Sequence, residues 1–238
     1  SVVRNFKPDC AVGVGGYASG PVLRIATQLG IPTLLQEQNS YAGVTNKILG
    51  KKASKICVAY ERMERFFPKE KIIFTGNPVR AGLENLAEKP EEAYPFFNLE
   101  KGKPVVLVVG GSLGARTLNQ SMVAGFEAIR QSGVQFIWQC GKYYYNDMKA
   151  ALEAYPVGNI HLMEFISRMD LAYAVADVVI SRAGAGTISE LCLVGKPSIL
   201  VPSPNVAEDH QTSNAMALVE KGAARLVKDV EAKDKLIA

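Results

Sequence analysis

Short β-branched apolar runs alternate with helical stretches along almost the whole chain of 238 residues. Two of the runs, VVLVV at 105–109 and DVVIS at 177–181, are apolar on both faces. A parallel strand that is covered by helices on each side has this pattern. The alternation therefore predicts an α/β fold built on open parallel sheets.

The individual elements follow from the same patterns. Strands are expected at 10–14, 33–36, 55–59, 72–75, 105–109, 135–139, 161–164, 177–181 and 198–201. Helices are expected at 20–29, 42–51, 115–132, 145–154, 168–176, 186–194 and 209–221.

A polar, acidic and proline-bearing segment, AGLENLAEKPEEAYPFFNLEKGKP at 81–104, separates two groups of strands. We predict a linker at 81–103 between an N-terminal domain at 1–80 and a C-terminal domain at 104–238. The opening SVVRNFKPD reads as the tail of a helix, and the chain stops inside another helix. We therefore expect an N-terminal domain that lacks its first strands, with an unpaired sheet edge prone to association.

Composition limits the class of partner. A net charge of +4, 48% apolar residues and 21% charged residues describe an ordinary globular protein. The mild positive charge fits anionic small molecules or an acidic surface and does not by itself indicate nucleic acid. The cysteines are spaced singly, which predicts buried reduced thiols and no metal site at Cys10, Cys57, Cys140 and Cys192.

Three glycine-rich bends follow predicted strands, where open α/β sheets bind ligands because helix N-termini point bare N–H groups outward. In the first, GVGGYASGP at 13–21, the glycines let the backbone approach a bulky anion, and Ser19 adds a hydroxyl. A tight turn without a ligand explains the same glycines, because glycine also serves plain turn geometry.

The second bend, VVGGSLGARTLN at 108–119, offers Ser112 and the following amides to a diphosphate oxygen. It resembles a dinucleotide fingerprint but is not GxGxxG, and the next strand ends in WQCGK without an acid. A nicotinamide ribose normally needs that carboxylate, so an NAD or FAD site is disfavoured.

The third bend lies in SRAGAGTISE at 181–190. A carboxylate near a helix N-terminus is stabilised by roughly 0.3–1 kcal/mol, so Glu190 has a purely structural explanation. The sharper hypothesis is that Glu190 accepts two hydrogen bonds from a ribose, while the small residues make room for a sugar or diphosphate. Together, the bends and this acid describe a nucleotide-diphosphate site.

Several motifs resemble those of the MurG family, the UDP-N-acetylglucosamine transferases that complete the lipid-linked peptidoglycan precursor. They are GVGGYASGP, LQEQNSYAGVTNK, TGNPVR, VVGGSLGARTLN, ISRAGAGTISELCLVGKPSILVPSP and EDHQTSNA. The resemblance covers nearly the whole chain. It implies the GT-B fold, with two Rossmann-like doubly wound domains facing across a cleft, and here an incomplete N-terminal domain.

The resemblance also implies roles for matching residues. Donor-site contacts are implied for Asn39, Arg80, Ser112, Ile166, Ala185, Gly186, Thr187, Ile188, Ser189, Glu190 and Gln211. Contacts to the acceptor diphosphate are expected at Gly15, Gly16, Tyr17 and Ser19. Arg80 suits a point where negative charge grows on departing UDP, since no cluster of metal ligands is apparent. We expect no cofactor and no metal.

One family element has no match in this sequence. The GGTGGH-type loop, whose histidine is a favoured general base, is absent. Either the sequence is a piece of a longer chain or it cannot turn over. The remaining base candidates are Glu37, beside Asn39, and His210, which fits a donor-site or solvent histidine better; His161 is expected to be structural.

The resemblance implies transfer of GlcNAc from UDP-GlcNAc to the 4-hydroxyl of MurNAc-pentapeptide on undecaprenyl diphosphate. It also implies a peripheral enzyme on the cytoplasmic face of the bacterial inner membrane, with no nucleic-acid partner. In AGVTNKILGKKASK, Val44, Ile48 and Leu49 lie near one helix face. Lysines surround them, so the helix either packs on its own sheet or meets the anionic leaflet.

Three other functions stay open. A UDP-GlcNAc 2-epimerase shares the two-domain architecture, although the EQN…TNK and GNPVR motifs argue against it. A chain that lacks the base could bind the nucleotide sugar without catalysing transfer. A dinucleotide oxidoreductase is the most distant, for want of the ribose acid after the second bend.

Overall fold

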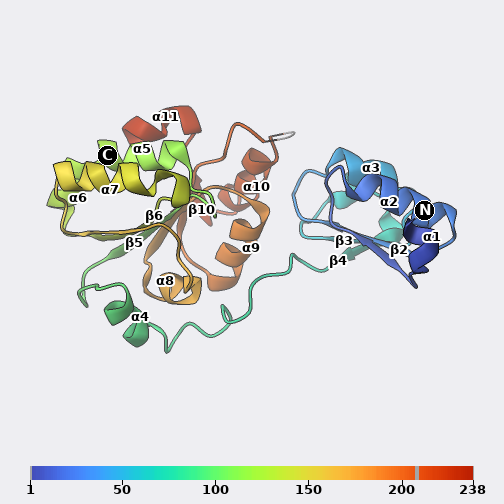
Figure 1. The fold of residues 1–238 in the computed structure, drawn as a ribbon, viewed down its shortest axis with the longest axis horizontal. Helices are drawn as coiled ribbons and strands as arrows, with labels where there is room; N and C mark the ends of the chain where they lie inside the picture. Colours follow the sequence, from blue (N-terminus) through green and yellow to red (C-terminus); the bar gives the residue numbers. More distant parts are fainter. Residues whose placement is uncertain (1, 207–208, 238) are drawn as a thin grey trace. The chain divides into compact units, whose positions relative to one another are not determined.

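A computed structural model of the chain describes residues 2–206 and 209–237. The chain divides into two compact units, each built on one parallel sheet (Figure 1). The first unit comprises residues 1–78 and 206–214, and the second comprises 79–205 and 215–238. The expected fold class, α/β with Rossmann-like parallel sheets, is confirmed. The boundaries of the predicted linker stay a prediction.

The first unit contains a four-stranded sheet in the order β1-β2-β3-β4. Its strands are β1 (Ala11–Gly13), β2 (Thr33–Glu37), β3 (Lys55–Val58) and β4 (Ile72–Phe74). Its helical elements are α1 (Val2–Phe6), α2 (Ser19–Gln28), α3 (Val44–Gly50), η1 (Met63–Arg65) and η2 (Lys69–Lys71). Leu23 of α2 packs with Leu35 and Ile56 of the sheet in an apolar core.

The second unit contains a six-stranded sheet in the order β10-β9-β8-β5-β6-β7. Its strands are β5 (Val105–Val109), β6 (Gln135–Gln139), β7 (Ile160–Met163), β8 (Val178–Ser181), β9 (Ser198–Leu200) and β10 (Ala224–Leu226). Its helical elements are α4 (Pro90–Phe96), α5 (Arg116–Ala124), α6 (Phe126–Ser132), η3 (Lys142–Tyr144), α7 (Tyr145–Ala154), α8 (Met169–Val175), α9 (Ala185–Val194) and α11 (Asp229–Lys235). The remaining helix, α10 (His210–Val219), contributes residues to both units.

Helices α5, α6, α7 and α11 lie along one face of the second sheet, and α8 lies on the other (Figure 1). Because both faces are covered, β5 is apolar throughout, and Leu107 of β5 and Trp138 of β6 are fully buried. No helix in the described ranges combines the length and the apolar character that a membrane crossing requires.

Three local expectations are corrected. The helix predicted at 115–132 breaks at Gly125, where a Cβ atom would lie 2.3 Å from Ile237. Strand β10 and helix α4 were missed because both are short, and α4 carries a proline inside it.

The prediction that all four cysteines are buried is also wrong. Cys10, at the edge of the first sheet, and Cys192, on α9, are exposed, and Cys57 is half-buried. Only Cys140 is buried, and this burial raises the pKa of its thiol to about 11.

Candidate functional site

The second sheet reverses its direction of growth between β5 and β8. The chain moves outward from β5 through β6 to β7, then returns to β8 and continues to β10 on the other side. Ligands of open α/β sheets bind at such a switch point, beyond the carboxyl ends of the strands. Val109 of β5 pairs with Ser181 of β8, so the second and third bends leave the sheet at the same level. The structure thus brings these two sequence-predicted bends together.

Close backbone packing determines the shape of the second bend. Gly114 has φ +79°, and a Cβ atom there would lie 1.9 Å from the carbonyl oxygen of Cys140. At Gly110 a Cβ atom would lie 2.4 Å from the backbone nitrogen of Ala115. Ser112 remains exposed at the tip of the bend. The glycines therefore serve packing, while the exposed tip is available to an anion.

The third bend is open where the second is tight. Cβ atoms added at Gly184 or Gly186 would meet nothing within 4 Å. Packing of the chain therefore does not require glycine at either position. The side chain of Ile188 is buried in the core, so only its backbone can face a ligand. Ser189 donates its hydroxyl to the carbonyl of Ala185, 2.9 Å away.

Glu190 occupies the second turn of α9, beyond the first turn where the helix dipole acts most strongly. One carboxylate oxygen, Oε1, lies 2.8 Å from Nε of Arg80, and the other, Oε2, accepts a 3.0 Å hydrogen bond from the hydroxyl of Tyr173. The Glu190 side chain is 13% exposed and that of Arg80 is 51% exposed. The two residues to which the sequence assigned the ribose and the diphosphate therefore form an ion pair in the second unit.

Two other predicted donor-site residues have different surroundings. The side chain of Ile166, in the loop after β7, is 1% exposed, so only its backbone can contact a base, as the resemblance implies. Thr187 is half-buried on α9. Both lie in the second unit.

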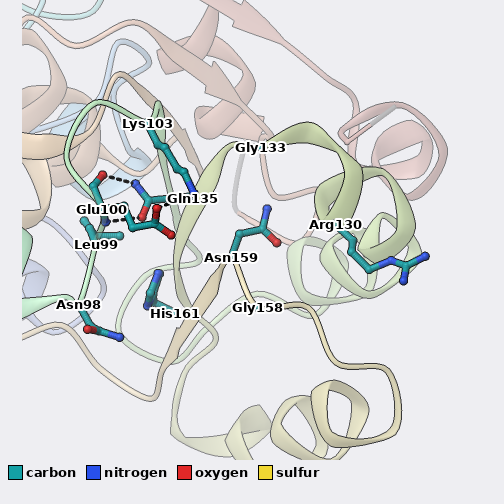
Figure 2. A pocket seen from close by; sticks show the side chains of 10 residues that line it. All are labelled: Asn98, Leu99, Glu100, Lys103, Arg130, Gly133, Gln135, Gly158, Asn159 and His161. Atoms are coloured by element: carbon teal, nitrogen blue, oxygen red, sulfur yellow. Dashed lines mark hydrogen bonds and ion pairs between the residues drawn. The ribbon is translucent and has the colours of Figure 1, made fainter.

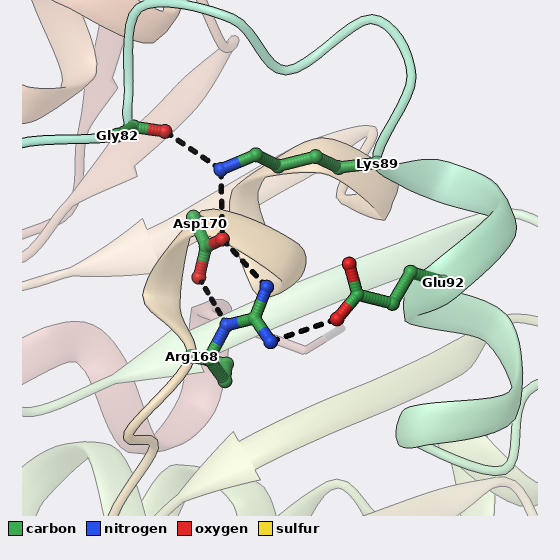
Figure 3. A network of polar contacts seen from close by, with 5 residues as sticks. All are labelled: Gly82, Lys89, Glu92, Arg168 and Asp170. Atoms are coloured by element: carbon green, nitrogen blue, oxygen red, sulfur yellow. Dashed lines mark hydrogen bonds and ion pairs between the residues drawn. The ribbon is translucent and has the colours of Figure 1, made fainter.

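A polar network that sequence reasoning missed fastens the segment after Arg80 to helix α8 (Figure 3). Lys89 donates to the carbonyl of Gly82 and to Oδ2 of Asp170. Arg168 donates to both oxygens of Asp170 and, at 2.7 Å, to Glu92 of α4. The Arg168 guanidinium holds the pKa of the Asp170 carboxyl well below its usual range. The sequence signal for this network was the presence of opposite charges in 81–103 and 168–170. Which of these charges pair depends on the tertiary structure.

In the first unit, Glu37 does not fit the predicted role of a general base. It is 2% exposed, and both oxygens are engaged. Oε1 accepts from the backbone and the side chain of Asn39, and Oε2 accepts from the backbone of Gly43 and from Nδ2 of Asn46 at 2.9 Å. Such a carboxylate presents no free oxygen to an acceptor hydroxyl. It orders the loop that follows β2.

The other family motifs of this unit join the same loop. Asn77 of the GNP motif donates to the carbonyl of Gln38 at 2.9 Å and accepts from Gln36 at 3.1 Å. Asn214, buried on α10, accepts from the backbone of Ser40 and donates to Oδ1 of Asn39 at 3.0 Å. These motifs therefore stabilise the carboxyl edge of the first sheet.

The remaining predicted residues of this unit are spread along it. Gly15 and Gly16 adopt φ +86° and +76° in the first bend, and Tyr17 is 90% exposed. Ser19 donates its hydroxyl back to the carbonyl of Gly16 at 3.0 Å, as a turn without a ligand also requires. Gln211 is half-buried in the first turn of α10; Ala207 and Glu208, within its motif, lie outside the described residues.

A cavity of about 610 Å³ lies at the opposite edge of the second sheet (Figure 2). Gln135 and His161, at the amino ends of β6 and β7, line it. Two of its polar side chains bond within the protein: Gln135 exchanges two hydrogen bonds with the backbone of Glu100, and Asn159 donates to the carbonyls of Ile129 and Val134. This cavity lies at the amino ends of the strands, whereas the switch point lies at their carboxyl ends.

Comparisons with known proteins show the family of the chain. Residues 105–238 match the glycosyltransferase family 28 C-terminal domain, and residues 1–58 match the N-terminal domain of the same family. A protein of Parabacteroides distasonis named UDP-N-acetylglucosamine--N-acetylmuramyl-(pentapeptide) pyrophosphoryl-undecaprenol N-acetylglucosamine transferase is 61% identical over 235 residues. These residues make up 99% of this chain and 64% of that protein. The chain thus spans less than two thirds of this relative.

Solved structures give the same result. The crystal structure of MurG from Acinetobacter baumannii aligns with a TM-score of 0.73 and 33% identity, over 96% of this chain and 62% of that one. A UDP-GlcNAc 2-epimerase from Neisseria meningitidis, bound to UDP-GlcNAc, aligns with a TM-score of 0.67 over 99% of this chain and 69% of that one. At 18% identity, the epimerase shows the fold alone. The resemblance to the MurG family that the motifs predicted is confirmed.

Proposed function

Since the chain belongs to glycosyltransferase family 28, we propose that it transfers GlcNAc from UDP-GlcNAc to the 4-hydroxyl of MurNAc-pentapeptide on undecaprenyl diphosphate. The observation that carries this proposal is the Arg80–Glu190 pair in the unit whose glycine bends flank the switch point. The carboxylate suits a ribose, and the bends suit a diphosphate.

Arg80 has the properties that a leaving diphosphate requires. Its guanidinium is half-exposed and is paired through Nε, which leaves the other nitrogens available to phosphate oxygens. A fixed positive charge at the bond that breaks stabilises the growing charge on UDP. Ser112 and the amides of its bend would hold the same diphosphate from β5.

The acceptor side of the proposal rests on the first unit. Gly15, Gly16, Tyr17 and Ser19 form the bend that would meet the acceptor diphosphate, and Asn39 and Gln211 remain donor contacts by resemblance. Glu37 is withdrawn as the base, because it is buried and its oxygens accept hydrogen bonds from Asn39, Gly43 and Asn46.

We also propose that helix α3 meets an anionic leaflet, on the cytoplasmic face of the membrane. Val44 and Ile48, one turn apart, are 56% and 68% exposed, and Lys51 and Lys52 follow them. Each lysine near an anionic surface adds about 1 kcal/mol. Leu49, expected on the same face, instead packs against the core of the first unit. Flotation with anionic vesicles, but not with neutral ones, is expected, and Ile48→Ser with Lys51→Ala should abolish it.

The test of function is incubation with UDP-GlcNAc and a lipid acceptor analogue. Appearance of the disaccharide product supports the proposal. Formation of the epimerised nucleotide sugar would assign the chain to the epimerases instead. Calorimetric binding of UDP without either product would identify a nucleotide-sugar binder.

A further inference from the structure

Tyr173 is a buried tyrosine whose hydroxyl reaches the carboxylate to which we assign the ribose. It lies on α8, is 1% exposed, and donates to Oε2 of Glu190 at 3.0 Å. Arg80, from a different segment, is bonded to Oε1. Two donors on two oxygens fix both the position and the plane of the carboxylate.

The remaining capacity of this carboxylate matches a diol. An ionised carboxylate offers about four acceptor sites, two on each oxygen. Arg80 and Tyr173 use one on each oxygen. One acceptor site is then left on each oxygen, and the two neighbouring hydroxyls of a ribose can each donate to one.

Helix α8 is a rigid support for this tyrosine. Asp170, one turn before Tyr173, is held by Arg168 and Lys89, which tie α8 to α4 and to the segment after Arg80 (Figure 3). Burial, followed by the charge of Glu190, raises the pKa of Tyr173, so its hydroxyl stays protonated and remains a donor.

We propose that Tyr173 is a positioning residue of the nucleotide site: with Arg80, it holds the Glu190 carboxylate in the orientation that accepts both ribose hydroxyls of a uridine nucleotide. This inference rests on the proposed function. Tyr173 itself touches no ligand; its effect on binding passes through Glu190.

The experiment measures calorimetric Kd values of the chain for UDP and for 2′-deoxy-UDP. The wild type should bind UDP more tightly, because the deoxy analogue leaves one acceptor site of Glu190 unfilled. Tyr173→Phe should weaken UDP binding by about three- to tenfold and reduce the ratio of the two Kd values. Partial unfolding of the variant scales both Kd values alike, so the ratio reports orientation and not stability.

Tyr155→Phe is the matched control, because it removes a hydroxyl that donates to another carboxylate of the same unit, that of Glu127. It should change neither Kd. In a Glu190→Ala background, Tyr173→Phe should have no further effect on the ratio.

The outcomes separate the inference from its premise. Suppose that the wild type binds UDP more tightly than 2′-deoxy-UDP and that Glu190→Ala does not. An unchanged ratio of the two Kd values in Tyr173→Phe then overturns the role of Tyr173 alone. An equal loss for both nucleotides also overturns it, since a merely structural role would produce that result. A wild type that binds neither nucleotide overturns the proposed function as well.

Discussion

Each of the two units has a carboxylate near the carboxyl edge of its sheet, and the surroundings of the two differ. Glu37, at the end of β2, is 2% exposed and accepts hydrogen bonds from the backbones of Asn39 and Gly43 and the side chains of Asn39 and Asn46. Glu190, on the helix after β8, is 13% exposed and bonded by Arg80 and Tyr173. The first carboxylate has its acceptor sites filled by the fold, and the second keeps sites for a ligand.

The difference shows that a polar residue in a motif can serve either the fold or the ligand. Family resemblance implied a ribose contact for Glu190, whereas Glu37 was a base candidate because of its position beside Asn39 at the end of a strand. Burial and the count of donors separate them, because a fully bonded buried carboxylate contributes to stability and has little capacity for new partners. For a substitution of either acid, the change in the free energy of unfolding is therefore to be compared with the change in UDP affinity.

The largest effect is expected at the second bend. Gly114→Ala places a Cβ atom 1.9 Å from the carbonyl oxygen of Cys140 at a positive φ, and should lower the free energy of unfolding by about 3 kcal/mol or more. Gly133→Ala is the control, with a similar φ of +70° and open space around it, and should cost only about 1 kcal/mol. Urea denaturation measures both; equal losses would mean that packing does not shape the bend.

Glu37→Gln should come next. The amide nitrogen of glutamine would face donors from Asn39, Gly43 or Asn46, so we expect a loss of about 2–3 kcal/mol in unfolding free energy. UDP affinity should not change. Glu61→Gln, at an exposed site, should be neutral in both measurements. A loss of UDP affinity without a loss of stability would mean that Glu37 serves a ligand and not the fold.

Asp170→Asn should have a smaller effect and lower the free energy of unfolding by about 1–2 kcal/mol at neutral pH. The loss arises because Arg168 and Lys89 remain charged and lose the carboxylate that both of them bond. The pKa of Asp170 is lowered in the folded state, so its contribution is complete above the usual aspartate pKa of 3.8. The contribution disappears as the pH falls below that value toward the folded pKa. The difference in unfolding free energy between the variant and the wild type, measured by denaturation, should therefore be smaller at pH 3 than at pH 7. An equal difference at the two pH values would contradict this account.

The smallest change in stability is expected for Arg80→Ala. The ion pair with Glu190 is half-exposed at its arginine end, and such pairs contribute about 0.2–1 kcal/mol. Its effect on turnover should exceed its effect on UDP affinity, because the charge that it offsets grows as UDP departs. Transfer assays and calorimetry on the same variant check this, and an unchanged turnover would remove Arg80 from the reaction.

Much of this fold was predictable from the sequence. Runs such as VVLVV and DVVIS determined parallel strands, and the glycines at 110, 114, 184 and 186 marked the bends. Each of these signals is local. Strand β10 and helix α4 were too short for their periodicity to be recognised.

The partners of the site acid were not predictable in the same way. Tyr173 belongs to an apolar helix, DLAYAV, where a buried aromatic residue is the ordinary expectation. Only the fold places its hydroxyl against Glu190. The burial of Glu37 was missed for a related reason: its donors come from a loop whose course is set by Asn46, Asn77 and Asn214.

A crystal of the chain soaked with UDP tests the central claim most directly. We expect the ribose hydroxyls within hydrogen-bond distance of Glu190 and the diphosphate beside Ser112, at the carboxyl ends of β5 and β8. Density for the nucleotide in the 610 Å³ cavity at the amino ends of β6 and β7, or at no ordered position, would contradict the assignment of the switch point as the donor site.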